Sequence, residues 1–291
     1  MNTFSSSAAT AACLAILLAT PSSAVPAPEE KAAVVTVLTE SGTPMRDLTA
    51  ADFVVKEGGR KLDVVEARLV PAPLSVLLLL DAAQHSRGLP PTNEVRAAVT
   101  TFVKTVFDAS PDASIALWQF ASGQTVVADF TSSPAQLNVA VSRLFFNQQT
   151  TAALLETLES AGEAMARRSG PRRAIVTVDF DTPDGSALGR IQPAADSITN
   201  SGATLWALSV RQQGASNPNR EEVLDKMTKA SGGQRYSIGS PSALEPRLKN
   251  VAASLTSQYL VTFTRTATGA LKTLTFETTK GAKVLATPFM R

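Results

Sequence analysis

The sequence predicts an α/β fold in which a mostly parallel sheet carries helices on both faces and is flanked by N- and C-terminal β-strand segments. The first observation is an apolar run at residues 76–80 that ends on Asp81, as is typical of a strand buried on both faces. The second is an alternation of strand and helix patterns from residue 71 to 258. The third is a set of short alternating strands near each end, which predicts a small accessory β unit.

The composition describes a folded chain with no electrostatic preference for one class of partner. The 291 residues are 44% hydrophobic, which is enough for one large domain or two modest ones. The formal net charge of +2 argues against nucleic acid or an anionic membrane as an obligate partner. The charge balance therefore does not identify the partner.

Residues 1–24 predict a signal peptide, because they contain no Asp, Glu, Lys or Arg and an apolar run at 8–19 leads into Ser22-Ser23-Ala24. This predicts an exported protein, periplasmic or extracellular. Cys13 is the only cysteine and lies within this segment, so the mature chain would contain no disulfide. No later run is long enough to predict a transmembrane helix.

The N-terminal β segment, residues 25–70, contains an alternating strand at 34–39. A short helical turn at 48–53 is expected to present Phe53 inward, and strands at 54–55 and 62–69 surround the Gly58-Gly59 turn. This segment is too small to fold alone. We expect it to pack with a C-terminal β segment, residues 259–291, whose strands lie at 259–265, 271–278 and 283–287.

The central α/β domain is predicted to span residues 71–258, inserted between these two β segments. Its predicted helices lie at 93–107, 133–144, 151–168, 193–200, 221–230 and 242–257. Its predicted parallel strands lie at 76–80, 115–120, 174–178 and 204–210, with an antiparallel edge strand at 126–130. Trp118 and Trp206 fall within these strands and are expected in the core.

The order of these motifs resembles the von Willebrand factor type A domain, a Rossmann-like fold, and more closely the acidobacterial von Willebrand factor type A-related proteins, a secreted bacterial family. The resemblance lies in three stretches, namely Ser41–Thr49 with Asp52-Phe53 and Glu57-Gly58-Gly59, the central domain, and Ser231-Gly232-Gly233 with Gln258–Val261. It covers nearly the whole mature chain. It implies protein binding through the carboxyl edge of the sheet.

The resemblance also implies a metal-ion-dependent adhesion site, built in the family from an Asp-x-Ser-x-Ser loop, a Thr and an Asp. Magnesium prefers such oxygen ligands. Here Asp81 is kept, but Ala83 and His85 replace the two serines, and Phe180 stands where the family has its Asp. The site is therefore predicted to be degenerate. The predicted partner-binding edge comprises Asp81, Gln84, His85, Ser86, Thr150, Thr151, Asp179 and Asp181.

No cofactor is predicted, although Mg²⁺ or Mn²⁺ remains an alternative, with Asp81, Thr151, Asp179 and Asp181 as its ligands. Thr150 or Thr151 is instead expected to cap the helix that follows. The leading hypothesis is an exported, non-enzymatic protein-binding module. One alternative is divalent-cation-dependent adhesion through an altered metal site. The other is a phosphate-ester hydrolase that uses Asp179 as nucleophile and Asp181 as general acid, by similarity to the Asp-x-Asp loop of haloacid dehalogenase-like enzymes.

Overall fold

The computed structural model describes residues 28–70, 73–83, 91–146, 149–180, 182–211, 218–265 and 273–290. Within these ranges, no helix combines the length and the apolar character needed to cross a membrane. Several predictions fall outside the described residues, namely the signal peptide with Cys13 and the site residues Gln84, His85, Ser86 and Asp181.

A six-stranded sheet forms the centre of the larger unit, and its strand β5 (Leu74–Asp81) is buried along its whole length. Strands β5, β6, β8 and β9 run parallel and β7 pairs antiparallel with β6 at one edge, as predicted, and β10 runs parallel to β9 at the other edge. The strand order is β10 (Gln234–Ile238), β9 (Thr204–Val210), β8 (Arg172–Phe180), β5, β6 (Ser114–Phe120) and β7 (Gln124–Thr131).

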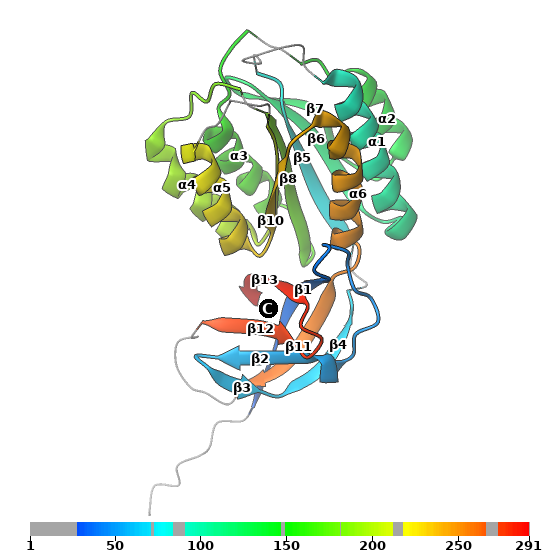
Figure 1. Ribbon diagram of the computed structural model, residues 1–291, viewed down its shortest axis with the longest axis vertical. Coiled ribbons are helices and arrows are strands. Elements are labelled where there is room, and N and C mark those ends of the chain that lie inside the picture. The colour runs from blue at the N-terminus through cyan, green and yellow to red at the C-terminus, as the bar shows by residue number, and fades with distance from the viewer. Residues whose placement is uncertain are drawn as a thin grey trace, which may run out of the picture.

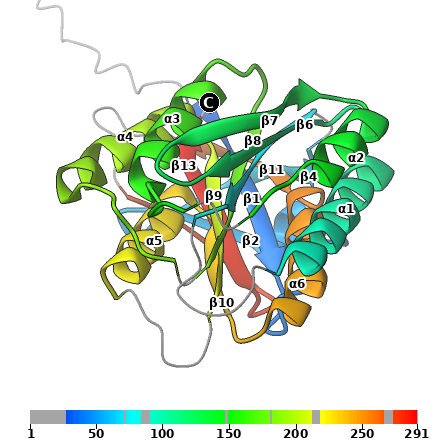
Figure 2. The ribbon, with the colours of Figure 1, turned by 90° about the horizontal axis from the view of Figure 1, so that it is seen from above.

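Helices cover both faces of this sheet, which confirms the predicted α/β fold (Figure 2). One face carries α1 (Thr92–Ala109), α2 (Pro134–Ser142) and α6 (Leu244–Leu255). The other carries α3 (Leu154–Ala166), α4 (Ile191–Ser201) and α5 (Pro218–Ser231). Alternation along β5 sends Leu78 and Leu80 toward α1 and α6, and Leu77 and Leu79 toward α3–α5. Asp81, two residues after Leu79, therefore belongs to the face covered by α3–α5.

The accessory β unit combines strands from both ends of the chain, again as predicted (Figure 1). Its core includes Phe53, which is only 3% exposed and packs against Tyr259 with ring centroids 5.4 Å apart. The preceding helical turn is the 3-10 helix η1 (Ala50–Asp52). One sheet has the order β13 (Lys283–Met290), β1 (Glu29–Leu38), β11 (Tyr259–Arg265) and β4 (Val64–Leu69), and the other β12 (Leu274–Thr278), β2 (Phe53–Glu57) and β3 (Arg60–Leu62).

The glycine pair after α5 joins the two units. A Cβ on Gly232, which has φ +76°, would lie 2.1 Å from the carbonyl oxygen of Ala286 in β13. A Cβ on Gly233 would lie 1.9 Å from the carbonyl oxygen of Leu205 in β9. Any other residue would collide with backbone at both places, so the end of α5 is packed tightly between the sheet and the accessory β unit.

The sequence did not reveal every element. Strand β10 was not predicted, because Gln234, Arg235 and Ser237 interrupt the apolar pattern of a strand that forms the edge of the sheet. The short 3-10 helices η2 (Leu188–Arg190) and η3 (Pro241–Ala243), which precede α4 and α6, were not predicted as separate elements. Helix α2 begins as predicted, since Ser133 Oγ accepts a hydrogen bond from the backbone N–H of Gln136 and Pro134 follows the cap.

Candidate functional site

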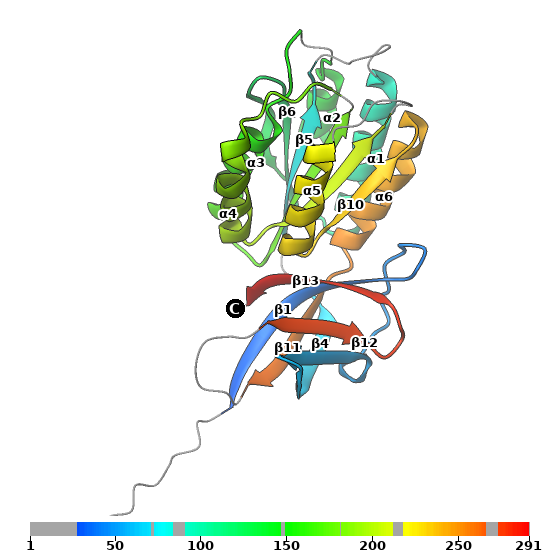
Figure 3. The same cartoon turned by 60° about the vertical axis from the view of Figure 1, so that its left-hand side comes forward.

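The carboxyl ends of the parallel strands point away from the accessory β unit (Figure 3). In open α/β sheets this end is where ligands usually bind, because loops and helix N-termini converge there. We use the name carboxyl edge for the cluster formed here by Asp81 at the end of β5, Asp179 near the end of β8, Asp184 in the loop after β8, and Arg220 in α5.

Asp81 is fully buried, and both of its carboxylate oxygens accept hydrogen bonds from the protein itself. Oδ1 accepts from the backbone N–H of Ala83 at 3.0 Å. Oδ2 accepts from the hydroxyl of Thr182 at 2.5 Å and from the backbone N–H of Phe180 at 3.3 Å. Burial raises the pKa of Asp81, although the charge of Arg220 and these hydrogen bonds oppose the shift. The carboxylate thus binds together the ends of β5 and β8.

Asp179 is 3% exposed and lies on the same face of the sheet as Asp81. Its Oδ1 accepts a hydrogen bond from the hydroxyl of Ser209 in β9 at 3.2 Å. Burial, with the nearby charge of Asp81, raises the pKa of Asp179 to about 7 against the opposing effect of Arg220 and Ser209. A nucleophilic role would need an accessible, ionised carboxylate, so this environment is a poor one for the hydrolase mechanism.

Arg220 is the central cation of this cluster, and sequence analysis did not identify it. Its side chain is 5% exposed and enters the carboxyl edge from the first turn of α5. Nε donates to Asp184 Oδ2 at 2.7 Å, and Nη1 donates to the carbonyl oxygen of Phe180 at 3.0 Å and lies 3.7 Å from Asp81 Oδ2. Burial alone would raise the pKa of Asp184, but the Arg220 charge and hydrogen bonds from Arg220 and Ser186 lower it.

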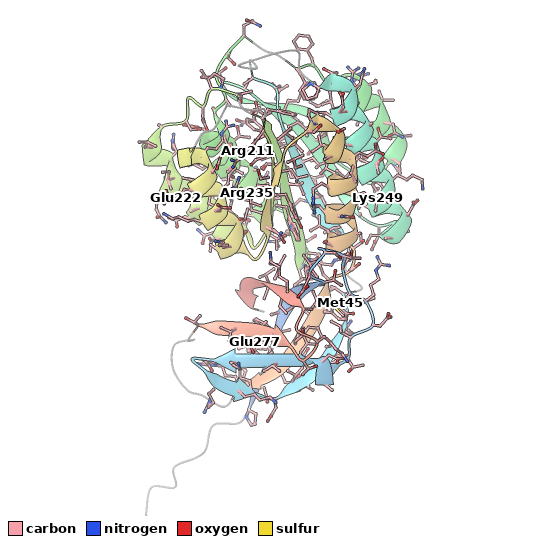
Figure 4. The ribbon with its side chains drawn as sticks, in the orientation of Figure 1. Met45, Arg211, Glu222, Arg235, Lys249 and Glu277 are labelled. Atoms are coloured by element: carbon pink, nitrogen blue, oxygen red, sulfur yellow. The ribbon has the colours of Figure 1, made fainter. Side chains whose placement is uncertain are left out.

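Two further arginines fix α5 against the sheet. Arg235 of β10 pairs with Asp225 at 2.7 Å, and Arg211, just after β9, pairs with Glu221. Figure 4 shows Arg211 and Arg235 between α5 and the strands, with Glu222 on the far side of the helix. The N-terminal half of α5 is therefore held by ion pairs on its inner side. These pairs fix the part of the helix backbone from which Arg220 extends.

The two threonines predicted at this edge are exposed, and neither caps α3, so the capping prediction is wrong. Helix α3 begins at Leu154 after the N-cap residue Ala153. The hydroxyl of Ser186 takes that role from another loop, accepting a hydrogen bond from the backbone N–H of Leu155 at 3.0 Å. Thr150 Oγ1 instead accepts from the backbone N–H of Ser122 at 3.3 Å. Thr151 lies against Gly185, where an added Cβ would meet its Oγ1 at 2.5 Å.

Phe180, at the position where the family has an Asp, points to the other face of the sheet and joins the core beside α1 and α6. Alternation in β8 explains this, because Phe180 has the same parity as Val176 and Val178. The neighbouring Asp179 faces the carboxyl edge instead, and Thr182 beyond it supplies the hydroxyl that binds Asp81. Sequence analysis placed Asp179 near the edge but missed Thr182, Asp184 and Ser186.

A cavity of about 140 Å³ opens beside the ion pair of Asp184 and Arg220. Its walls are mainly apolar and come from α3, η2, α4 and α5, with Leu188 of η2 at 71% exposure. An apolar cavity of about 150 Å³ is large enough to hold benzene. The lining residues are Leu154, Leu155, Asp184, Ser186, Leu188, Ile191, Arg220 and Val223.

The described residues do not fit the magnesium ion that the family resemblance implies. A metal ligand needs a free oxygen lone pair directed at the ion, and a magnesium ion takes about six oxygen ligands. The oxygens of Asp81 accept hydrogen bonds from three protein groups, and the guanidinium of Arg220 brings a positive charge next to them. Among the described residues, no group of three or more His, Cys, Asp or Glu side chains is placed to hold a metal ion.

Several solved structures are similar to this chain, and the first of them supports the fold. The von Willebrand factor type A protein from Catenulispora acidiphila aligns with a TM-score of 0.54 and 17% identity, over 81% of this chain and 51% of that one. The chain thus spans about half the length of that protein. The SpRpn10 VWA domain aligns with a TM-score of 0.48 and 14% identity, over 60% of this chain and 93% of that one.

The vWF domain of the type V pili tip protein Mfa5 from Porphyromonas gingivalis aligns with a TM-score of 0.48 and 13% identity, over 63% of this chain and 95% of that one. A search of curated proteins found no match. The family model of the von Willebrand factor type A domain matches residues 75–254, which is more than half of the 291 residues. The chain therefore belongs to the von Willebrand factor type A domain family, whose domains are generally non-enzymatic modules that often act in protein–protein interaction or adhesion.

Proposed function

We propose that this chain is an exported, non-enzymatic protein-binding module with a degenerate metal-ion-dependent adhesion site. Its partner binds at the carboxyl edge of the sheet, and binding needs no divalent cation. The module is a von Willebrand factor type A domain, and domains of this family commonly bind other proteins. The partner contacts the loops around Asp81, Asp179 and Thr151, with Gln84, His85, Ser86, Thr150 and Asp181 as further predicted contacts.

One observation carries the metal-independent part of this proposal, namely the burial of Asp81 among internal hydrogen-bond donors. In a metal-dependent site the corresponding carboxylate must turn an oxygen toward the ion. Here Ala83 donates to Oδ1, and Thr182 and Phe180 donate to Oδ2. A cation at Oδ2 would have to displace one of its two donors, and a cation at either oxygen would have to overcome repulsion from Arg220. Partner binding through the surrounding surface has no such cost.

The cavity beside Asp184 and Arg220 gives the partner an anchoring point. Binding energy at protein interfaces is concentrated in a few side chains that fill pockets. The apolar walls of Leu154, Leu188 and Val223 suit a leucine or phenylalanine side chain of the partner, and the volume of about 140 Å³ matches such a group. Leu188 at the rim is 71% exposed, so it is available for contact.

Export and the narrower family assignment are supported by the sequence. The uncharged apolar segment before Ala24 supports a signal peptide. The motifs around Ser41-Gly42 and Ser231-Gly232-Gly233 support membership in the acidobacterial von Willebrand factor type A-related group. We also propose that residues 25–70, 71–258 and 259–291 are the N-terminal β segment, the central domain and the C-terminal β segment of the mature protein.

Isothermal titration with Mg²⁺ and with Mn²⁺ tests the metal-independent part. We expect no saturable heat for the wild-type chain and no difference in the variant Asp81→Ala. Tight binding that disappears in Asp81→Ala would instead establish cation-dependent adhesion through an altered metal site. A phosphate-ester turnover that depends on Asp179 would contradict the non-enzymatic assignment.

Capture of partners from envelope extract tests the binding surface. We expect the same proteins to be retained with and without a chelator, and to be lost with Leu188→Glu, which places a charge at the rim of the cavity. Val65→Glu is the matched control, since Val65 is 51% exposed on β4 of the accessory β unit, away from the carboxyl edge. Loss of capture in the chelator, or equal loss in both variants, would contradict the proposed surface.

A further inference from the structure

Three carboxylates of the carboxyl edge are arranged around one guanidinium. Asp81 ends β5, Asp179 lies near the end of β8, and Asp184 lies in the loop that follows β8. These side chains are 11% exposed or less. Arg220 reaches them from α5, with its Nε 2.7 Å from Asp184 Oδ2 and its Nη1 3.7 Å from Asp81 Oδ2.

Buried carboxylates need a compensating positive charge, because removal from water strongly disfavours an unpaired anion. Where a metal-ion-dependent adhesion site is intact, a divalent cation provides that positive charge at the ends of the strands. Here the sequence has lost the serine hydroxyls expected at residues 83 and 85, while Arg220 brings a planar cation with fixed donors to the same strand ends. Guanidinium groups pair well with carboxylates and remain charged at all ordinary pH values.

We infer that Arg220 is the resident cation of the carboxyl edge, and that its guanidinium provides the positive charge that a divalent cation would otherwise supply. The same contacts make Arg220 a positioning residue, because they tie the first turn of α5 to β5, to β8 and to the loop after β8. The edge is therefore held in one arrangement without an ion. This inference rests on the metal-independent part of the proposed function and makes no use of the partner.

The test asks whether the effect of Asp184→Asn on stability changes sign when the charge of Arg220 is removed. Thermal or urea unfolding of the full chain measures this effect. In the wild-type background, Asp184→Asn removes a carboxylate that pairs with Arg220 and is expected to lower the melting temperature. In the background of Arg220→Met, which keeps an unbranched apolar stem but no charge, the same Asp184→Asn change removes an uncompensated carboxylate and is expected to raise it. A side chain that acted only by packing would not reverse the sign.

Two additional variants keep the test decisive. If Arg220→Met does not fold, Arg220→Gln can replace it, because Gln retains an N–H donor for the carbonyl oxygen of Phe180. The effect of Asp184→Asn is then measured in the Arg220→Gln background. Arg220→Lys keeps the charge, so Asp184→Asn should again lower the melting temperature in that background. If Asp184→Asn also lowers the melting temperature when residue 220 is Met or Gln, the inference is wrong.

Divalent cations separate this inference from the rest of the proposed function. Mg²⁺ and Mn²⁺ should leave the melting temperature of the wild-type chain unchanged, and a stabilising response would contradict both the inference and the metal-independent part of the proposed function. Loss of partner capture without any cation response would contradict only the proposed partner surface. Absence of the sign reversal alone would contradict only the role of Arg220.

Discussion

Two buried arginines, one in each unit of the molecule, show how differently a guanidinium can be used. In the accessory β unit, Arg265 of β11 pairs with Glu57 of β2, with Nε 2.9 Å from one carboxylate oxygen and 3.1 Å from the other. Their side chains are 8% and 3% exposed. At the carboxyl edge, Arg220 is equally buried but lies among Asp81, Asp179 and Asp184.

The difference lies in the ratio of charges. One guanidinium with one carboxylate makes a neutral pair, which joins the two sheets of the accessory β unit. One guanidinium among three carboxylates leaves an excess of acid, and burial, together with the nearby charge of Asp81, raises the pKa of Asp179 to about 7. Such an imbalance is unfavourable for folding, so we interpret it as a feature of a functional site.

The largest expected effect on stability comes from breaking the pair of Arg265 and Glu57. The substitution Arg265→Met leaves Glu57 buried without its cation and is expected to lower the free energy of unfolding by about 3–5 kcal/mol. Urea denaturation measures this loss. Adding Glu57→Leu to the same chain removes the unpaired carboxylate and should restore most of the stability. A double variant no more stable than the single one would show that the pair is not an isolated unit.

The second prediction concerns Asp179 and the pH dependence of stability. Because its pKa is raised from 3.8 to about 7, this carboxyl is protonated in the folded chain and ionised in the unfolded chain between those pH values. The folded chain then binds more protons, so its stability falls as the pH rises through this window. Asp179→Asn should remove that loss and raise the free energy of unfolding at pH 8 by about 2–4 kcal/mol.

Asp184 provides the matched control, since its pKa is shifted in the opposite direction. The stability it contributes is present above its unfolded pKa and is lost as the pH falls through its lowered value. Asp184→Asn should therefore destabilise the chain by about 1–3 kcal/mol at pH 7, with the difference fading in acid. Unfolding curves from about pH 2 to 8 compare the two variants, so that the range includes the lowered pKa of Asp184. If the free energy of unfolding depends on pH equally steeply in Asp179→Asn and in the wild type, the raised pKa of Asp179 is contradicted.

The two sites also show which features a sequence can reveal. Strands β5 and β9 were predicted because their apolar runs require burial on both faces, whatever their neighbours are. Arg220 was not predicted as a site residue, because it lies at the polar start of α5, where Arg and Glu are typical of a solvated helix end. Its burial results from contacts with Asp81 and Asp184, which only the folded chain brings together. Ser186 was missed for the same reason, since it caps a helix from a different loop.

The third prediction separates a hydroxyl that belongs to the carboxyl edge from one that does not. Thr182 donates to Asp81 at 2.5 Å, so Thr182→Val should lower the free energy of unfolding by about 1–3 kcal/mol. Thr177 is fully buried in β8, and its hydroxyl has no hydrogen-bond partner among the described residues. Thr177→Val should therefore leave the stability unchanged or raise it by about 1 kcal/mol. Similar losses in both variants would mean that packing, and not the bond to Asp81, accounts for the effect of Thr182.

The smallest expected effect is at the start of α3. Ser186→Ala removes the oxygen that accepts a hydrogen bond from the backbone N–H of Leu155 and should cost about 1 kcal/mol, as the loss of a helix cap usually does. Thr151→Ala, at an exposed residue that does not cap the helix, should change the stability by less than about 0.5 kcal/mol. Urea denaturation of both variants ranks them directly. The reverse order would contradict the assignment of Ser186, rather than Thr151, as the residue that caps α3.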